Sequence, residues 1–390
     1  MWYRHSILLI VVGIIVISCS LELTPVIIES PWRFLPDSLL YEIENDITRS
    51  YISLVDYKDD KQYLYTEITR YDKQTTTYRK DISTALRITV PTLNEHDNSS
   101  YYIRIRKEQF IDYLIPLTED NSLLLDNLEP NSYFYLDVIQ EREGKQITVH
   151  SGRVFVSGQI RMINLDGYKV GNIRDLGGWK TLDGGEIVYG RLYRGAELYR
   201  EKDGDVLISI SEKGIKTFVN ELKIDVELDF GDVSESSPLE KSGVEFIHGN
   251  QYAIQAYAKG LETETLRNRY ACCIRLIIEK LSEGKNVYFH CNAGADRTGT
   301  LAFIIEALLG VSDSDLSKDY ELTSFSCLNT PRYRISDGFK SLVFYFRDNF
   351  HGNNLSEQVY NMATSSIEEN GLGLSQDEVA LLRSILVKSY

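Results

Sequence analysis

The stretch that decides the fold runs from Asn286 to Gly310 and reads NVYFHCNAGADRTGTLAFIIEALLG. Its first four residues, Asn286–Phe289, predict a short strand of the buried type. The part from Thr298 to Leu309 is a strongly apolar helix that Gly310 closes. A strand, a short loop and a helix, within a chain that alternates strands and helices after Gly158, predict an α/β domain with a mostly parallel central sheet flanked by helices.

The connecting loop carries a cysteine and, six positions later, an arginine. Successive backbone N–H groups of such a loop, at a helix N-terminus, converge on one point and can bind an anion. Gly294 permits the tight curvature. Arg297 supplies a planar, charged fork for two phosphate oxygens. The expected phosphate-binding residues are Asn292, Ala293, Gly294, Ala295, Asp296 and Arg297.

This arrangement predicts hydrolysis of phosphate monoesters through a covalent intermediate on Cys291, which the field of the loop favours as a thiolate. The loop amides and Arg297 would stabilise charge on the equatorial oxygens in the transition state. Thr298 would hydrogen-bond the thiolate, and His290 would have a structural role near it. No metal or other cofactor is expected, because the loop and the arginine already neutralise the phosphate. A buried, purely structural Cys291 is the alternative.

Two further motifs stand upstream, Gly171–Gly178 (GNIRDLGG) and Gly190–Gly195 (GRLYRG). Together with the HCx5R loop they resemble the bacterial atypical tyrosine/serine phosphatase family, some members of which also act on phosphoinositides. The likeness extends from about Asn172 to the Asp319–Tyr320 pair and more loosely beyond, over somewhat more than half of the chain. It implies a cysteine-dependent phosphatase fold.

The resemblance also implies that Arg174 and Asp175 support the phosphate loop from beside it. The alternative is that both residues only brace a turn with Gly177 and Gly178.

A leaving oxygen needs a proton donor within hydrogen-bond reach. No aspartate occurs between Asp232 and Asp296, and the resemblance points to Asp296 as the general acid. Asp229 and Asp232 are the alternative donors, and Asp296 could instead only brace the loop.

Three functions remain open from the sequence: a protein phosphatase acting on phosphotyrosine, with or without phosphoserine and phosphothreonine; a phosphoinositide or inositol-phosphate phosphatase; and an inert surface binding protein. The related enzymes that act on phosphoinositides often carry lysine where this chain has Ala295. Its absence weakens the second hypothesis, unless Lys169, Lys180 or Arg194 compensates for the missing charge.

The N-terminus has a basic start followed by an apolar run from Ile7 to Ile17, too short to span a bilayer, which takes about 20 residues. The following Ser18–Cys19 resembles the cleavage site of bacterial lipoproteins. We therefore expect residues 1–18 to be a signal peptide and Cys19 to be lipidated, which would tether an exported protein to a membrane and face it towards the periplasm or the cell surface. An ordinary signal or an uncleaved anchor is the alternative.

The segment 19–157 is rich in short alternating runs separated by polar turns, which predicts an antiparallel β-sandwich. Within it, the stretch Leu128–Tyr133 resembles the tyrosine-corner segment of fibronectin type III domains. We expect the catalytic domain to occupy residues 158–390. The net charge of −15 argues against binding to a nucleic-acid backbone, so the expected partner is a phosphorylated protein or a small phosphomonoester.

Overall fold

The protein is described from a computed structural model, which covers residues 33–36, 86–89, 100–107, 111–116, 122–125, 127–156, 158–231, 236–326, 328 and 332–389. The expected signal peptide, Cys19 and Asp232 lie outside these residues. None of the described helices is both long and apolar enough to cross a membrane.

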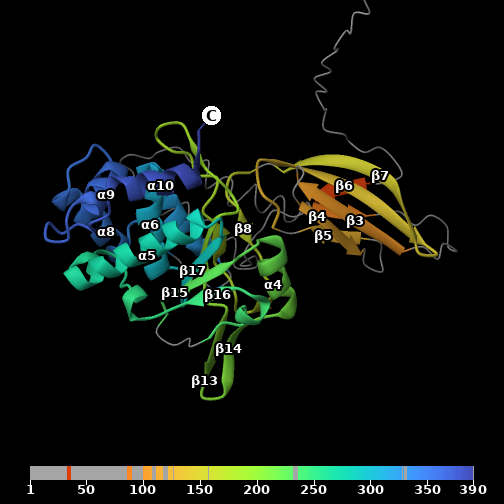
Figure 1. Ribbon diagram of the computed structural model, residues 1–390, viewed down its shortest axis with the longest axis horizontal. Coiled ribbons are helices and arrows are strands. Elements are labelled where there is room, and N and C mark those ends of the chain that lie inside the picture. Colours follow the sequence, from red (N-terminus) through yellow and green to blue (C-terminus); the bar gives the residue numbers. More distant parts are fainter. Residues whose placement is uncertain are drawn as a thin grey trace, which may run out of the picture.

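The second half of the chain is built on a six-stranded sheet with the order β16-β15-β17-β12-β10-β8 (Figure 1). Its strands are β8 (Met162–Ile163), β10 (Ile173–Asp175), β12 (Leu192–Ala196), β15 (Val226–Asp229), β16 (Glu245–Ile247) and β17 (Val287–Cys291). The four strands from β16 to β12 pair in parallel, whereas β10 and β8 pair antiparallel at one edge. The predicted α/β class is confirmed, with an antiparallel edge added to the parallel core.

Alternation along β17 supplies both faces of this sheet. Val287, Phe289 and Cys291 join the larger hydrophobic core, which the main helices cover. Tyr288 points to the opposite face and meets the Phe218 ring edge-on at 4.8 Å. The described helices of the larger core are α5 (Glu264–Ser282), α6 (Arg297–Leu309), α7 (Asp313–Leu322), α8 (Asp337–Asn349), α9 (Leu355–Thr364) and α10 (Gln376–Leu386).

Local signals in the sequence account for the ends of these helices. The Thr263 side chain accepts a hydrogen bond from the Leu266 amide at the start of α5. Ser375 and Glu378 form a reciprocal capping box on α10. Gly310 ends α6 with a φ of 90°, as its position in the sequence predicts. The strand and helix expected on either side of the cysteine loop are therefore confirmed.

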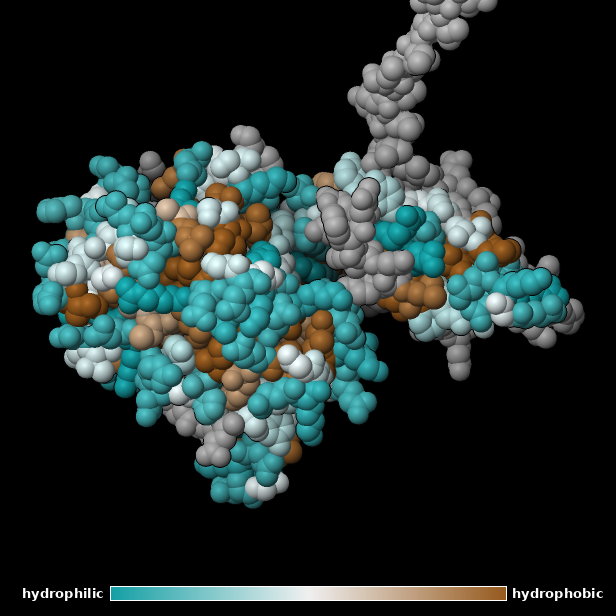
Figure 2. Space-filling view, in the orientation of Figure 1, coloured by the Kyte–Doolittle hydropathy of each residue, from teal (hydrophilic) through white to brown (hydrophobic). Residues whose placement is uncertain are grey.

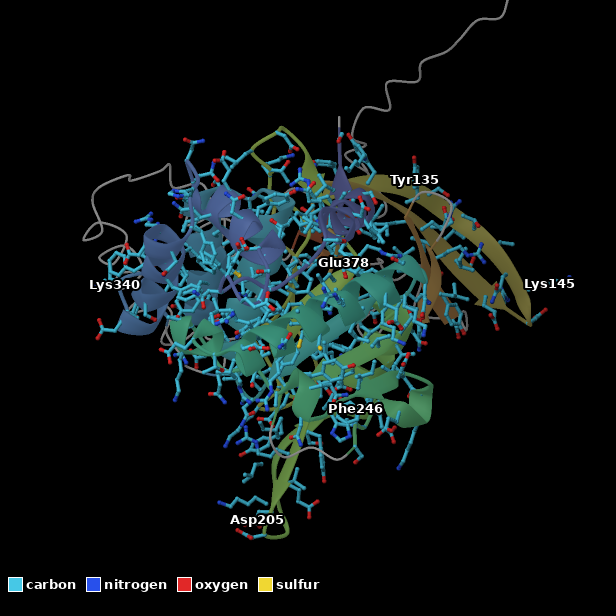
Figure 3. All side chains as sticks on the ribbon, turned by 60° about the vertical axis from the view of Figure 1, so that its left-hand side comes forward. Tyr135, Lys145, Asp205, Phe246, Lys340 and Glu378 are labelled. Atoms are coloured by element: carbon cyan, nitrogen blue, oxygen red, sulfur yellow. The ribbon has the colours of Figure 1, made fainter. Side chains whose placement is uncertain are left out.

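Shorter elements surround the sheet. A hairpin of β13 (Tyr199–Lys202) and β14 (Asp205–Ile210), extended by β9 (Gly167–Tyr168), projects from the molecule, with Asp205 at its tip (Figure 3). Its surface is largely hydrophilic (Figure 2). The other short elements are β11 (Glu186–Ile187), β18 (Val387–Lys388), α4 (Glu212–Lys216), the short π-helix Thr217–Glu221 and the 3₁₀ turns Glu240–Ser242, Asn250–Tyr252, Ala258–Leu261 and Thr323–Phe325.

The described strands of the N-terminal part are all antiparallel. β4, β3, β6 and β7 form one sheet, and β1, β2 and β5 form another. Their bounds are β1 Arg33–Pro36, β2 Leu86–Thr89, β3 Ser100–Lys107, β4 Ile111–Pro116, β5 Ser122–Leu125, β6 Ser132–Arg142 and β7 Lys145–Val156. Tyr133 of the supposed tyrosine corner is 41% exposed, while Phe134 is buried. The fibronectin-like sandwich stays a prediction, because most of residues 19–99 lies outside the described part.

Polar contacts join the two parts of the chain. The Asn127 side chain accepts a hydrogen bond from the Asn164 amide at 2.7 Å and donates one to the Asn164 carbonyl at 3.0 Å. The Arg161 Nε donates to the Asn127 carbonyl at 3.0 Å. These contacts hold the connection between β5 and β6 against the residues that flank β8, the first strand of the central sheet.

Candidate active site

The loop from Asn292 to Asp296 is held by its carbonyl groups. Residues of the surrounding scaffold donate hydrogen bonds to the carbonyl oxygens of Asn292, Ala293, Gly294 and Asp296 at distances between 2.8 and 3.3 Å. In order along the loop, the donors are the Glu197 amide, the Asn172 side chain, the Arg194 guanidinium and the Thr300 amide. The carbonyl oxygens of the loop therefore point away from its centre, towards the surrounding protein.

The opposite edge of the same peptide units carries the N–H groups, because the C=O and N–H of a trans peptide point in opposite directions. None of the backbone N–H groups from Ala293 to Asp296 donates to another described residue. Buried amides normally find an acceptor. A tetrahedral oxyanion placed inside the loop, at the N-terminus of α6, would supply it.

Two glycines from separate motifs make this loop sterically feasible. Gly294 has a φ of +63°, and a Cβ on it would lie 2.3 Å from the backbone of Gly195. A Cβ on Gly195 would in turn lie 2.5 Å from the Tyr288 hydroxyl. The loop and β12 therefore pass each other at backbone distance, which explains why GRLYRG and the cysteine loop occur together.

Beneath the loop lies a buried cluster of one aspartate and two arginines. Arg174 donates to Asp319 Oδ1 at 2.8 Å and to its carbonyl at 2.7 Å, and Arg194 contacts Asp319 Oδ2. Arg174 also donates to Asn172 at 2.9 Å, the residue that binds the Ala293 carbonyl. Burial alone would raise the pKa of Asp319, but the two guanidinium groups lower it below its usual range. Arg174 thus connects to the loop through Asn172.

Asp175 has another place. Its carboxylate accepts the amides of Gly177 at 2.9 Å and Gly190 at 2.7 Å, and it lies 3.5 Å from Arg161. Burial raises its pKa to about 6. The structure therefore places Asp175 in the turn, as the alternative interpretation holds, and Arg174 beside the loop.

Cys291 ends β17 and is 4% exposed at the base of the loop. Thr298, in the first turn of α6, is fully buried, and its hydroxyl makes no hydrogen bond within the described chain. His290 Nε2 lies 2.9 Å from Glu227 Oε1, and Nδ1 lies 3.5 Å from Asp229. Burial would lower the pKa of His290, but these carboxylates and Cys291 raise it to about 9. A protonated His290 therefore stands behind Cys291 at neutral pH.

Arg297 folds back over the loop. Its guanidinium donates to the Phe230 carbonyl at 2.6 Å and to the Asn292 side chain at 2.9 Å. These contacts fix the guanidinium beside the loop, next to the end of β15. A bound phosphate would compete with them for the same N–H groups.

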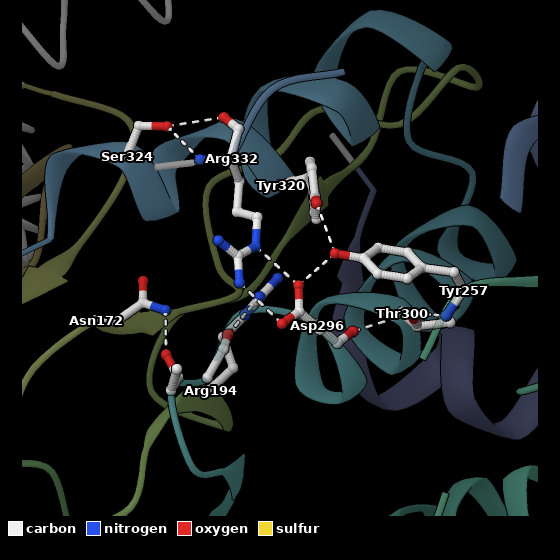
Figure 4. A network of polar contacts seen from close by, with 10 residues as sticks. Asn172, Arg194, Tyr257, Asp296, Thr300, Tyr320, Ser324 and Arg332 are labelled. Carbon is white, nitrogen blue, oxygen red and sulfur yellow. Dashed lines mark hydrogen bonds and ion pairs between the residues drawn. The ribbon is translucent and has the colours of Figure 1, made fainter. Parts of the chain in front are cut away.

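Asp296 lies at the centre of a polar network (Figure 4). Arg332 donates to both of its carboxylate oxygens, at 2.7 and 2.8 Å, and the Tyr257 hydroxyl donates to one of them. Burial would raise the pKa of Asp296, but these donors, with the charges of Arg332 and Arg297, lower it. The side chain is 38% exposed. Asp229, in contrast, is buried between the Gly231 amide and His290.

The basic residues considered as substitutes for a lysine at position 295 lie elsewhere. Ala295 is completely buried. Lys180 pairs with Glu186, Lys169 lies over the Tyr168 ring at 5.1 Å, and Arg194 is enclosed beneath the loop. Of the three, Arg194 is the one with a described contact to the loop, and it binds the Gly294 carbonyl from the buried side.

The sequence alone indicates no role for Asn172, Tyr257, Asp319 or Arg332. Asn172 belongs to the motif Gly171–Gly178, so its position two residues before Arg174 could have indicated a role at the site. Tyr257 and Arg332 are far from the loop in the chain, and nothing in the local sequence marks them.

The fold and the site define an α/β protein whose amide-lined loop, between a cysteine and an arginine, can hold an oxyanion. The model of the tyrosine phosphatase family matches residues 164–388, and the chain belongs to this family. It is similar to a protein of Cupriavidus necator named "putative tyrosine-protein phosphatase", with 27% identity over 172 residues. That match covers 39% of this chain and 59% of the relative's length.

Proposed function

We propose that the protein hydrolyses phosphate monoesters through a cysteinyl-phosphate intermediate on Cys291, with phosphotyrosine in proteins as its substrate. The observation that carries the proposal is the loop itself: four of its five carbonyl groups accept hydrogen bonds from residues outside the loop, and its amides from Ala293 to Asp296 remain available to an anion. Membership of the tyrosine phosphatase family supports the same conclusion.

In this mechanism the Cys291 thiolate attacks phosphorus opposite the leaving oxygen, and the S–P bond forms as the P–O bond breaks. The amides and Arg297 stabilise the charge on the equatorial oxygens. The Thr298 hydroxyl, buried and without another partner in the described chain, would donate to the sulfur when water displaces it.

Access to the leaving oxygen makes Asp296 the candidate proton donor, a role that it can fill only when its carboxyl group is protonated. A donor must reach the leaving oxygen, which departs from the open side of the loop. Of the two described candidates, Asp296 is 38% exposed and Asp229 is buried. Asp232 lies outside the described residues.

Replacing Cys291 by serine tests the nucleophile. We expect Cys291→Ser to lower the kcat for p-nitrophenyl phosphate at least about a hundredfold, because a serine hydroxyl in this loop has no base to activate it. Binding of vanadate or tungstate, measured by calorimetry, should persist. The control is Cys272→Ser, since Cys272 is an exposed thiol on α5. Turnover of more than a few per cent in Cys291→Ser, or equal losses in both variants, would contradict the mechanism.

Assays of the wild-type protein on a phosphotyrosine peptide and on phosphoinositides separate the competing functions. Phosphoinositides hydrolysed faster than a phosphotyrosine peptide would replace the substrate class and keep the mechanism. A wild-type protein that binds vanadate but turns over none of these substrates would indicate an inert binding protein.

We also propose that the chain is an exported lipoprotein tethered through Cys19. Metabolic labelling with a palmitate analogue should mark the full-length protein, and Cys19→Ala should remove the label. Label that survives in the variant, or none in the wild type, would overturn this proposal.

A further inference from the structure

Hydrogen bonds to both residues hold the ion pair between Arg332 and Asp296 in place. The Ser324 hydroxyl accepts a hydrogen bond from the Arg332 amide at 2.8 Å and donates one to the Arg332 carbonyl at 2.7 Å. The backbone of Arg332 is therefore fixed to the end of the segment after α7, and its guanidinium reaches Asp296 with two parallel bonds. Such a fork is the strongest form of an arginine–carboxylate pair.

Tyr257 closes the same carboxylate from the other side (Figure 4). It has a φ of 59° and a ψ of −154°, a conformation that a residue with a side chain rarely adopts. The Tyr257 amide donates to Thr300 Oγ1 at 2.9 Å, and its hydroxyl lies 2.8 Å from the Tyr320 hydroxyl. A strained residue held by contacts at both ends is typical of a functional position.

These donors all favour the ionised form of Asp296. The charged and titratable groups that face the network are Arg332, Arg297, Tyr257 and Tyr320. Burial raises the pKa of Tyr320 to about 12, and burial also raises that of Tyr257, so both remain neutral donors at physiological pH. Asp296 therefore accepts three hydrogen bonds, and its ionised form predominates at neutral pH in the free protein.

We propose that Arg332 is a positioning residue that determines substrate class: by holding Asp296 as a carboxylate, it restricts the site to aryl phosphates such as phosphotyrosine and slows alkyl phosphates such as phosphoserine. The inference rests on the proposed function, because it concerns the leaving-group step of the same reaction.

The chemistry follows from where the electron pair goes. When the Cys291 sulfur bonds to phosphorus, the P–O bond breaks and its electron pair stays on the leaving oxygen. A phenolic oxygen, whose conjugate acid has a pKa of about 10, can leave as the anion and take a proton from water afterwards. A serine alkoxide is far more basic and needs its proton during the step. Only a protonated Asp296 can supply it.

The test compares Arg332→Met with a matched control, Arg334→Met. Arg334 lies on the same segment and forms the same kind of forked pair, donating to Glu321 Oε1 at 3.0 Å and to Oε2 at 2.7 Å, and none of its described contacts is with Asp296. The kcat/KM for a phosphoserine peptide and for the matching phosphotyrosine peptide is measured from pH 5 to pH 9. Arg332→Lys, which keeps the charge without the fork, is the second variant.

We expect Arg332→Met to raise the phosphoserine-to-phosphotyrosine ratio near pH 7 by about tenfold, the effect of a rise of about one unit in the pKa of a partly exposed aspartate. The alkaline limb of the pH profile for the phosphoserine peptide should move to higher pH by the same amount, about one unit. Arg332→Lys should lie between, and Arg334→Met should match the wild type. Adding Asp296→Asn to Arg332→Met should remove the gain.

A ratio that stays unchanged in Arg332→Met, changes equally in Arg334→Met, or remains raised after Asp296→Asn would overturn the inference and leave the proposed function standing. Carbon-13 titration of the Asp296 carboxyl gives an independent reading, since its midpoint should rise in Arg332→Met whether or not substrate turns over. A wild-type protein that hydrolyses neither peptide would overturn the proposed function as well.

Discussion

Single residues beneath the loop carry more of the site than their exposure suggests. Arg174, Arg194 and Asp319 are almost completely removed from solvent, and each makes at least one contact that leads to the loop. A buried charge is costly unless it is paired and hydrogen-bonded. Because Asp319 faces two arginines at once, its carboxylate keeps both of them in place under the carbonyl groups of the loop.

Replacing Asp319 should therefore destabilise the fold strongly. We expect Asp319→Asn to lower the free energy of unfolding by about 3–5 kcal/mol, because it leaves two buried guanidinium groups without their counter-charge. Urea denaturation at pH 7 measures this. The control is Arg275→Gln, whose exposed pair with Glu378 should contribute less than about 1 kcal/mol.

The contribution of Asp319 to the free energy of unfolding should also depend on pH. The pKa of Asp319 is lowered in the folded protein, so its contribution is present above the unfolded value of 3.8 and is lost as the pH falls through the folded value. The stability difference between wild type and Asp319→Asn should therefore narrow below about pH 4. A difference under 1 kcal/mol at pH 7, or one that does not vary with pH, would contradict the assignment.

At the scale of elements, the sequence predicted what short-range patterns determine. The strand β17, the helix α6 and its glycine end follow from apolar runs and a terminator that lie within 25 consecutive residues, Asn286–Gly310. The antiparallel edge strands β8 and β10 were not predicted, because two or three residues give no measurable alternation.

The parts of the candidate site that sequence could not predict are those that depend on tertiary contacts. Asp319 comes from α7 and binds the two arginines beneath the loop, whereas Arg332 comes from the segment before α8 and binds Asp296 directly. Asp175 shows the converse, since it adjoins Arg174 in sequence yet holds a different turn. Adjacent strand residues point to opposite faces, so a motif can serve two places at once.

At the scale of the whole molecule, the described chain has separate hydrophobic cores. One lies within the N-terminal strands, from Ile103 to Val156, and the two others lie on either side of the central sheet. All residues assigned to the proposed reaction lie between Asn172 and Arg332, inside the region that matches the family. Figure 1 shows the N-terminal strands beside the α/β part, to which β7 and β8 lead.

This arrangement predicts that the α/β part works alone. We expect a chain that begins at residue 158 to keep its kcat/KM for p-nitrophenyl phosphate within about a factor of two, because a domain with its own core folds independently. Its Tm should be lower than that of the full chain, since the Asn164 amide and the Arg161 side chain lose their contacts with Asn127. Full-length Asn127→Ala is the control and should show the lower Tm in part, with unchanged kinetics. A shortened chain that folds, by circular dichroism, but has lost most of its activity would show instead that the N-terminal strands contribute to the site.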